Sequence, residues 1–389
     1  MIRSMRFSLL GGLSPAQFLK RYWQKQPLLI RGAFPRFRDP ISRDELAGLS
    51  CEEQVMSRLV MERGGEKPWQ VIPGPQQVRH LRTLPESHWT LLVQGVDRYI
   101  PKVASLLDSF RFIPDWRVED VMISFAPRAG TVGPHIDSYD VFLLQGQGRR
   151  RWQLDSKAST ALRPHVDVRI LKRFKAEHEW ILEPGDMLYL PPGLAHYGVA
   201  LEECLTYSIG FRAPNAMELL NAAQERLMQS GQTPARYEDP HLRPAKFPAE
   251  IPRRAVDQLR RLLESGLRGL GGAEFDALAG EILTESKGGT YSKPRHLYPA
   301  DLRSRLTQRS ILVRSPGSRL AFLRRGQTVD LFADGRRYPL ESGLAFAAAL
   351  LTAEKQITFK LLAPHLAKKK FFQLLTDLMN AGVFFLHRS

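Results

Sequence analysis

The segment that decides the fold is residues 133–154, GPHIDSYDVFLLQGQGRRRWQL. It combines a Gly-Pro turn, a His-x-Asp pair (His135 and Asp137), an apolar run and three consecutive arginines. Residues i and i+2 of a strand project to the same face, so a strand through this pair presents both side chains together. An imidazole and a carboxylate on one face supply two of the three ligands of an iron centre that keeps open coordination positions.

A third ligand is expected from a distant strand. His196 follows a strand and a Pro-Pro-Gly loop in EPGDMLYLPPGLAHYG (183–198), 61 residues after His135, which leaves room for four or so strands of a double-stranded β-helix. A second His-x-Asp, at His165 and Asp167, lies in a polar stretch, and we expect it not to bind metal.

Composition limits the class of protein and the kind of metal site. The 389 residues suffice for two or three domains, and 43% apolar with 25% charged residues is typical of a soluble globular protein. No apolar run has the length of a membrane span, and no signal-peptide cleavage site follows the N-terminal apolar residues, so we expect a cytoplasmic protein. Two cysteines, Cys51 and Cys204, are too few for a thiolate cage, so imidazole and carboxylate must hold any metal.

Three regions follow one another along the chain. In residues 1–214, a capped helix and a strand precede short strands broken by Gly and Pro, which predicts a β-sandwich or barrel. Residues 215–290 have helical periodicity and more apolar surface than three short helices need, which favours a dimer interface over an intramolecular bundle. Residues 291–389 combine helices with a hairpin at Asp334-Gly335, which suggests a winged-helix-like domain.

Positive charge is concentrated in the last region. The net charge of the chain is +16, and residues 291–389 hold 17 Lys/Arg against 6 Asp/Glu, a net of +11. This asymmetry suggests an acidic partner such as nucleic acid or a ribonucleoprotein.

The arginine run offers a cation to the predicted barrel. Strand alternation sends Arg150 and Trp152 to one face and Arg149 and Arg151 to the other. If a bound cosubstrate is a dicarboxylate, its far carboxylate needs a bidentate cation, and we expect Arg150 to provide it.

These segments, together with QKQPLLIRGAF (24–34), resemble the JmjC-type 2-oxoglutarate oxygenases. More narrowly, they resemble the bacterial ribosomal oxygenases, which hydroxylate an arginine of the large-subunit ribosomal protein L-sixteen at its β-carbon. The resemblance covers essentially the whole chain. It implies a JmjC double-stranded β-helix (cupin-like) barrel, a helical dimerisation region and a winged-helix-like C-terminal domain, in a homodimer that uses Fe(II), 2-oxoglutarate and O2.

The resemblance also implies roles for individual residues. His135, Asp137 and His196 match the Fe(II) ligands, and Arg150 matches the basic residue that holds the distal carboxylate of 2-oxoglutarate. Ser124 matches a hydroxyl that assists from the preceding inward strand. Two further candidates for the substrate pocket are Tyr139, which we expect to face inward with Asp137, and Ser208 on the last core strand.

Alternatives remain open at this point. The target could be a histidine of another ribosomal protein, or an N-methyl-lysine, although the chain contains no sign of an aromatic cage. A cupin-type sensor barrel joined to a DNA-binding winged helix is a different class of protein that also fits the basic C-terminal region. A ribosomal-protein substrate is itself basic, so the charge does not attract that peptide, and contact with ribosomal RNA stays open.

Overall fold

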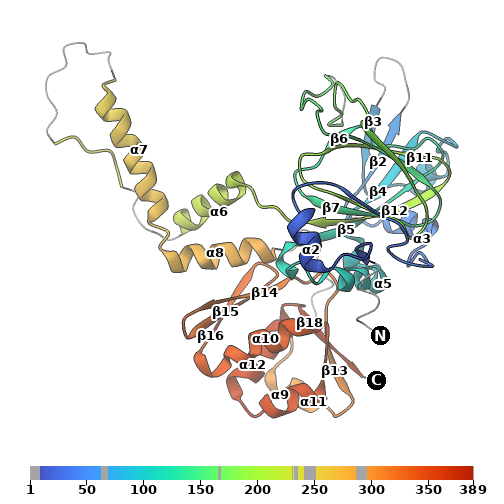
Figure 1. Ribbon diagram of the computed structural model, residues 1–389. Helices are drawn as coiled ribbons and strands as arrows, with labels where there is room; N and C mark the ends of the chain where they lie inside the picture. The colour runs from blue at the N-terminus through green and yellow to red at the C-terminus, as the bar shows by residue number, and fades with distance from the viewer. Residues whose placement is uncertain are drawn as a thin grey trace. The chain divides into compact units, whose positions relative to one another are not determined.

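The computed structural model divides into two compact units (Figure 1). It describes residues 9–62, 69–164, 168–229, 231, 235–240, 251–285 and 296–388. The first unit is Met1–Ala213 with Ser286–Ser318 and Glu354–Ser389, and the second is Pro214–Glu285 with Arg319–Ala353. Because both units take up part of the region after residue 290, the three domain boundaries drawn from the sequence stay predictions.

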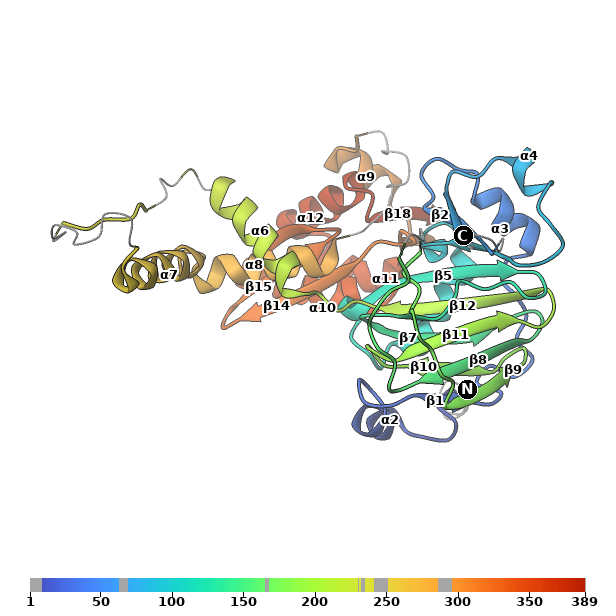
Figure 2. The same ribbon diagram turned by 90° about the horizontal axis from the view of Figure 1, so that it is seen from above.

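Two antiparallel sheets form the barrel of the first unit (Figure 2). The larger sheet has the order β1 (Leu28–Ile30), β10 (Met187–Leu190), β7 (Asp140–Gln145), β12 (Cys204–Phe211), β5 (Val118–Ala126), β4 (Trp89–Val93), β2 (Ser57–Glu62) and β3 (Trp69–Pro73). The smaller sheet has the order β6 (His135–Ile136), β11 (Ala195–Ala200), β8 (Arg150–Asp155) and β9 (His178–Leu182). The predicted double-stranded barrel is confirmed, with four strands between β6 and β11.

The two faces of the larger sheet have different partners. Phe142, Leu144 and Tyr189 belong to the outer core, which also includes Phe18 of helix α2 (Pro15–Arg21). This helix begins at a capping box in which Ser14 and Gln17 bond each other's backbone, as the sequence predicted. The opposite face packs with the smaller sheet around a second core, whose buried members are Val141, Leu143, Trp152, Leu154, Leu182, Leu188 and Leu190.

One expectation about the opening segment is wrong. A strand was expected to run through His135 and Asp137, but β6 ends at Ile136 and β7 begins at Asp140. The reason is topological: β6 pairs with β11 in the smaller sheet, whereas β7 pairs with β10 and β12 in the larger sheet. The chain therefore crosses between sheets at Asp137–Tyr139, and strand alternation does not continue through that turn.

The C-terminal part of the first unit is a separate small sheet with helices. Its strands have the order β17 (Gln356–Thr358), β13 (Ser310–Arg314) and β18 (Phe384–Arg388). The accompanying helices are α9 (Pro299–Arg305), α11 (Phe359–Leu362) and α12 (Lys369–Asn380).

The second unit contains the predicted helices and hairpin. The helices are α6 (Ala216–Gln229), α7 (Arg253–Arg268), α8 (Gly272–Thr284) and α10 (Ala345–Ala353), and the sheet has the order β14 (Leu320–Arg325), β15 (Thr328–Ala333) and β16 (Arg336–Leu340). Asp334 (φ 48°) and Gly335 (φ 75°) form the predicted tight turn between β15 and β16. Within the part of the chain that is described, no helix is long and apolar enough to cross a membrane.

Candidate metal centre

Three predicted ligands converge at one edge of the smaller sheet. His135 on β6 is the Cα partner of His196 on β11, and directly opposed residues of an antiparallel pair share a face. Asp137 lies in the turn after β6. Its Oδ2 is 3.9 Å from Nε2 of His135 and 3.6 Å from Nε2 of His196. One ligand atom from each residue lies within 4.8 Å of the others.

Backbone carbonyls fix both imidazoles with Nε2 turned toward Asp137. Nδ1 of His135 lies 3.0 Å from the carbonyl of Gly133, and Nδ1 of His196 lies 3.0 Å from that of Leu194. With Nδ1 as the donor in each bond, Nε2 keeps its lone pair for a metal. Burial, together with the nearby His135, lowers the pKa of His196 to about 4, so this imidazole is neutral at pH 7.

The donor set and its exposure fit a metal that must bind exchangeable ligands. The His196 side chain is 3% exposed, whereas those of His135 and Asp137 are 25% and 24% exposed, so the site opens on one side. Two imidazoles and one carboxylate on one face leave positions free, as in non-haem Fe(II) oxygenases. The competing pair, His165 and Asp167, lies outside the described residues.

Arg150 projects into the barrel from β8, as alternation predicted. It is 3% exposed, and its Nη1 donates to the Ser124 hydroxyl at 3.2 Å and to the Thr206 hydroxyl at 3.3 Å. Within the described part of the chain no carboxylate pairs with it, and its buried Nε has no partner. Burial lowers its pKa, yet a guanidinium stays charged at pH 7. Among the described residues, the barrel therefore holds a buried cation without a counter-ion.

The other predicted residues have different outcomes. Ser124 lies beside Arg150, and Ser208 is 8% exposed on the face of β12 that also carries Thr206. The strand expected to carry Tyr139 inward with Asp137 is broken, but burial together with Asp137 and Asp120 raises the pKa of Tyr139, and its place in the substrate pocket stays a prediction. Tyr139 lies in the turn between β6 and β7 and is 40% exposed.

Sequence reasoning missed two inward-facing residues. Thr206 is the Cα partner of Ser124, and its hydroxyl also bonds the Gln145 side chain at 3.3 Å. Asp120 lies on the same face of β5 as Ser124, four residues nearer the start of the strand. Burial raises the pKa of Asp120 to about 6, and the neighbouring Asp97 contributes. The parity that identified Arg150 would have found both once β5 and β12 were placed side by side.

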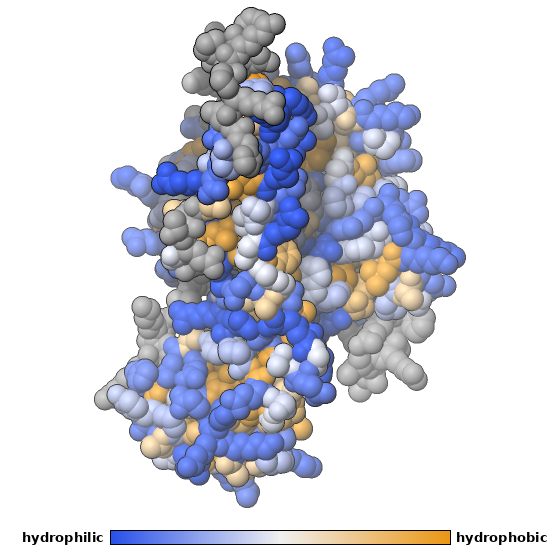
Figure 3. Space-filling model, turned by 90° about the vertical axis from the view of Figure 1, so that its left-hand side faces the viewer, coloured by the Kyte–Doolittle hydropathy of each residue, from blue (hydrophilic) through white to orange (hydrophobic). Residues whose placement is uncertain are grey.

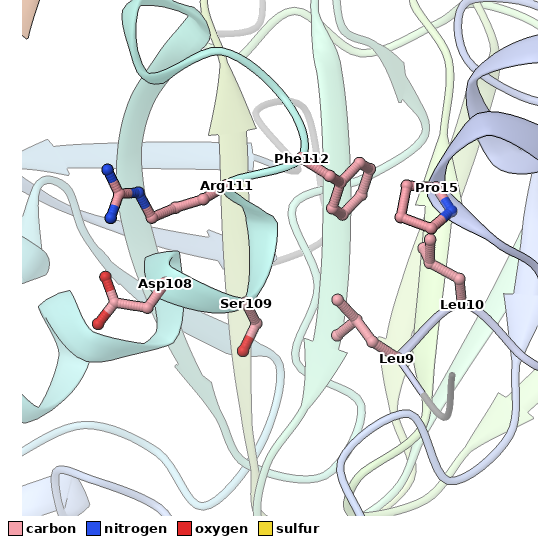
Figure 4. Close-up of a pocket in the computed structure, with 7 residues that line it drawn as sticks. All are labelled: Leu9, Leu10, Pro15, Asp108, Ser109, Arg111 and Phe112. Atoms are coloured by element: carbon pink, nitrogen blue, oxygen red, sulfur yellow. The ribbon is translucent and has the colours of Figure 1, made fainter. Parts of the chain in front are cut away.

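A separate hollow on the first unit carries no comparable chemistry. Figure 4 shows its lining residues: Leu9, Leu10, Pro15, Asp108, Ser109, Arg111 and Phe112. Arg111 is already engaged by Asp115 at 3.6 Å and Glu354 at 3.8 Å. The candidate metal ligands and the candidate carboxylate-binding arginine lie in the barrel instead.

Comparisons with protein families agree with this geometry. Residues 105–219 match the JmjC domain family, and residues 273–385 match the ROXA-like winged helix. The AraC-like ligand binding domain also matches, over residues 175–286.

Individual proteins match over much or nearly all of the chain. The ribosomal protein uL16 3-hydroxylase of Escherichia coli (strain K12) is 39% identical over 95% of this chain and 96% of its own. A probable ribosomal oxygenase of Haemophilus influenzae is 36% identical over 63% of this chain and 59% of its own. The structure of Escherichia coli YcfD with cobalt and 2-oxoglutarate, 37% identical, superposes with a TM-score of 0.82 over 96% of this chain and 98% of that one.

Proposed function

The chain belongs to the family of the ribosomal protein uL16 3-hydroxylase and is an Fe(II)- and 2-oxoglutarate-dependent oxygenase, and we propose that it hydroxylates the β-carbon of an arginine of uL16. uL16 is the L-sixteen protein of the large ribosomal subunit, which gives the enzyme a cytoplasmic place of action. The observation that carries the proposal is the buried, uncompensated Arg150 in the same barrel as the His-Asp-His triad.

His135, Asp137 and His196 would hold Fe(II), and Arg150 would hold the distal carboxylate of 2-oxoglutarate. When bound, these two groups activate O2, and the cosubstrate leaves as succinate and carbon dioxide while one oxygen atom enters a substrate C–H bond. The chain's own residues position the bound groups and exclude water from the site. Ser124 and Thr206 orient the guanidinium, and the apolar core around Leu143 excludes water from the far end of the site.

The register of β5 and β12 suggests where the substrate arginine lies. Each pair of opposed residues on the two strands forms one rung. The deepest rung, Ser124 opposite Thr206, contacts Arg150. The next rungs toward the start of β5 are Met122 opposite Ser208 and Asp120 opposite Gly210.

We propose that the substrate side chain lies along the two outer rungs and that its guanidinium pairs with Asp120. Two observations support this: burial raises the pKa of the carboxylate, which accepts a hydrogen bond from the Gly95 N–H at 2.8 Å, and Asp120 interacts electrostatically with Tyr139 in the turn beside the triad. A cation placed beside the Asp120 carboxylate would offset the free-energy cost of burying that negative charge. Tyr139 would then border the entrance, and Ser208 would contact the middle of the side chain.

Recombinant uL16 tests the proposal directly. We expect incubation with the enzyme, Fe(II) and 2-oxoglutarate to add the mass of one oxygen atom to an arginine, as read by peptide mass spectrometry. His135→Ala should abolish the product, whereas His178→Ala, an exposed histidine of the same small sheet, should not. Oxidation of a histidine in another ribosomal protein would redirect the substrate assignment. Salt-dependent binding of duplex DNA without 2-oxoglutarate turnover would favour the sensor class.

We also propose that two copies associate through α7. None of its residues is buried, and Val256, Leu259, Leu263 and Leu267 are 37%, 50%, 68% and 39% exposed. Their spacing of three and four residues forms one apolar stripe. Figure 3 shows apolar surface among hydrophilic side chains. A second copy of the stripe is a self-complementary cover for it.

Ribosomal RNA is the partner we propose for the basic C-terminal part of the first unit. Its described segments, 296–318 and 354–388, hold 10 Lys/Arg against 3 Asp/Glu. Lys368, Lys369 and Lys370 are exposed at the start of α12, whose first turn contains no acidic residue. Such a helix start, which favours negative charge, suits phosphate groups.

Salt-dependent RNA binding tests this surface. We expect replacement of the three lysines by serine to reduce the slope of log affinity against log salt for a large-subunit RNA fragment by about 2–3. Replacement of Arg38, Arg79 and Arg128, which are exposed elsewhere on the first unit, removes the same charge and should leave the slope nearly unchanged. Equal effects of the two triple variants would contradict the assignment.

A further inference from the structure

The indole of Trp152 lies between the two halves of the site. Trp152 is 5% exposed on the inner face of β8. Its Cα partner on β11 is Gly198, and that of Arg150 is Ala200. His196, Gly198 and Ala200 alternate along one face of β11. A line from the triad to the buried guanidinium therefore passes over Gly198.

Gly198 leaves the space that the indole fills. A Cβ at this position would lie 2.6 Å, 2.7 Å and 2.9 Å from Cζ3, Cη2 and Cε3 of Trp152. The ring centroid is 5.9 Å from that of His196 and 5.2 Å from Cζ of Arg150. A molecule that joins the metal to the guanidinium must lie against this ring.

The one polar atom of the ring has no partner. Nε1 of Trp152 is buried and, among the described residues, no acceptor bonds it. The six-membered edge rests on Gly198, so the edge that carries Nε1 is turned away from the backbone of β11. The buried side chains that cluster with the ring are apolar, and Arg150 is a donor only. Since buried N–H groups are normally bonded, an acceptor from outside the chain is expected.

We propose that Trp152 is a cosubstrate-binding residue whose Nε1–H donates to the distal carboxylate of 2-oxoglutarate. The inference rests on the proposed function. Arg150 of β8 holds that carboxylate together with Ser124 of β5 and Thr206 of β12, and Trp152, two residues further along β8, completes its coordination. The contact between the guanidinium and the indole keeps the two donors in a fixed arrangement.

Removal of the N–H group alone is the sharpest test. Position 152 is replaced by β-(3-benzothienyl)alanine, which keeps the shape of the ring without a donor, and in a second protein by Phe. Trp180→Phe is the matched control, because Trp180 is the half-buried Cα partner of Trp152 on β9. Isothermal titration measures the Kd for 2-oxoglutarate and for succinate with Mn(II) bound, which avoids turnover. The Kd for Mn(II) alone reports whether the triad is intact.

We expect both Trp152 variants to weaken 2-oxoglutarate and succinate about 10- to 100-fold, the effect of one hydrogen bond to a charged group. Mn(II) binding and the Trp180→Phe protein should stay within about 2-fold of wild type. An isostere that binds 2-oxoglutarate as the wild type does overturns the inference, as does a loss confined to 2-oxoglutarate, since succinate retains the distal carboxylate. A wild type that binds no 2-oxoglutarate overturns the proposed function as well.

Discussion

Replacement of Arg150 by Met should have opposite effects on the empty and the loaded protein. Arg150 is 3% exposed, and its guanidinium touches two hydroxyl groups and, in the described part of the chain, meets no carboxylate. Its desolvation is therefore uncompensated until an anion binds. Replacement of a buried ion pair by apolar residues of similar volume is often neutral or stabilises a protein by about 1–4 kcal/mol. Because Arg150 also has hydroxyl partners, we expect a gain of roughly 1–2 kcal/mol in the free energy of unfolding of the ligand-free protein.

The loaded protein should lose its response to the cosubstrate. At a 2-oxoglutarate concentration of about 100 Kd, the wild type gains about 2.7 kcal/mol from binding. Loss of two charge-assisted hydrogen bonds, each worth about 1.5–3 kcal/mol, raises the Kd by at least roughly 100-fold. The same concentration then stabilises the variant by no more than about 0.4 kcal/mol.

Urea unfolding with Mn(II), with and without 2-oxoglutarate, measures both effects. Arg149→Met is the matched control. Arg149 is 49% exposed and pairs with Glu202 at 3.0 Å on the surface, so we expect changes within about 0.5 kcal/mol in either state. An Arg150→Met protein that is less stable when empty, yet gains as much from 2-oxoglutarate as the wild type does, would refute the reasoning.

Three further outcomes are expected. Asp120, whose pKa rises to about 6 on folding, binds its proton more tightly in the native state. It therefore lowers stability as pH increases from about 4 to 6, and Asp120→Asn should be more stable than wild type at pH 7 but equal below pH 4 in urea titrations. Gly198→Ala places a Cβ 2.6 Å from the Trp152 ring and should cost about 1–3 kcal/mol of unfolding free energy; an unchanged midpoint would contradict this close packing. The double variant Leu259→Glu, Leu263→Glu should be a monomer in light scattering, where the wild type is a dimer. A monomeric wild type would refute the α7 interface.

The alternation of polar and apolar residues made much of the barrel predictable. The short strands, the capped helix at Ser14 and the hairpin turn at Asp334-Gly335 depend on local rules, and each forms where its residues indicated. Alternation also predicted the inward side chain of Arg150, because β8 is a regular strand from Arg150 to Asp155. The same rule does not extend to Tyr139, since the chain changes sheets between Ile136 and Asp140.

The sequence by itself determined which residue types could hold a metal and a dicarboxylate, and on which strands they stood. Only the tertiary structure decided which of them meet. His135 and His196 face each other because β6 pairs with β11, and Thr206 reaches Arg150 because β12 pairs with β5 across the barrel from β8. Burial, too, is a property of the closed barrel: it leaves Arg150 without a counter-ion and Nε1 of Trp152 without an acceptor among the described residues. These unmet groups arise from strands far apart in the chain, so no local pattern of residues contains them.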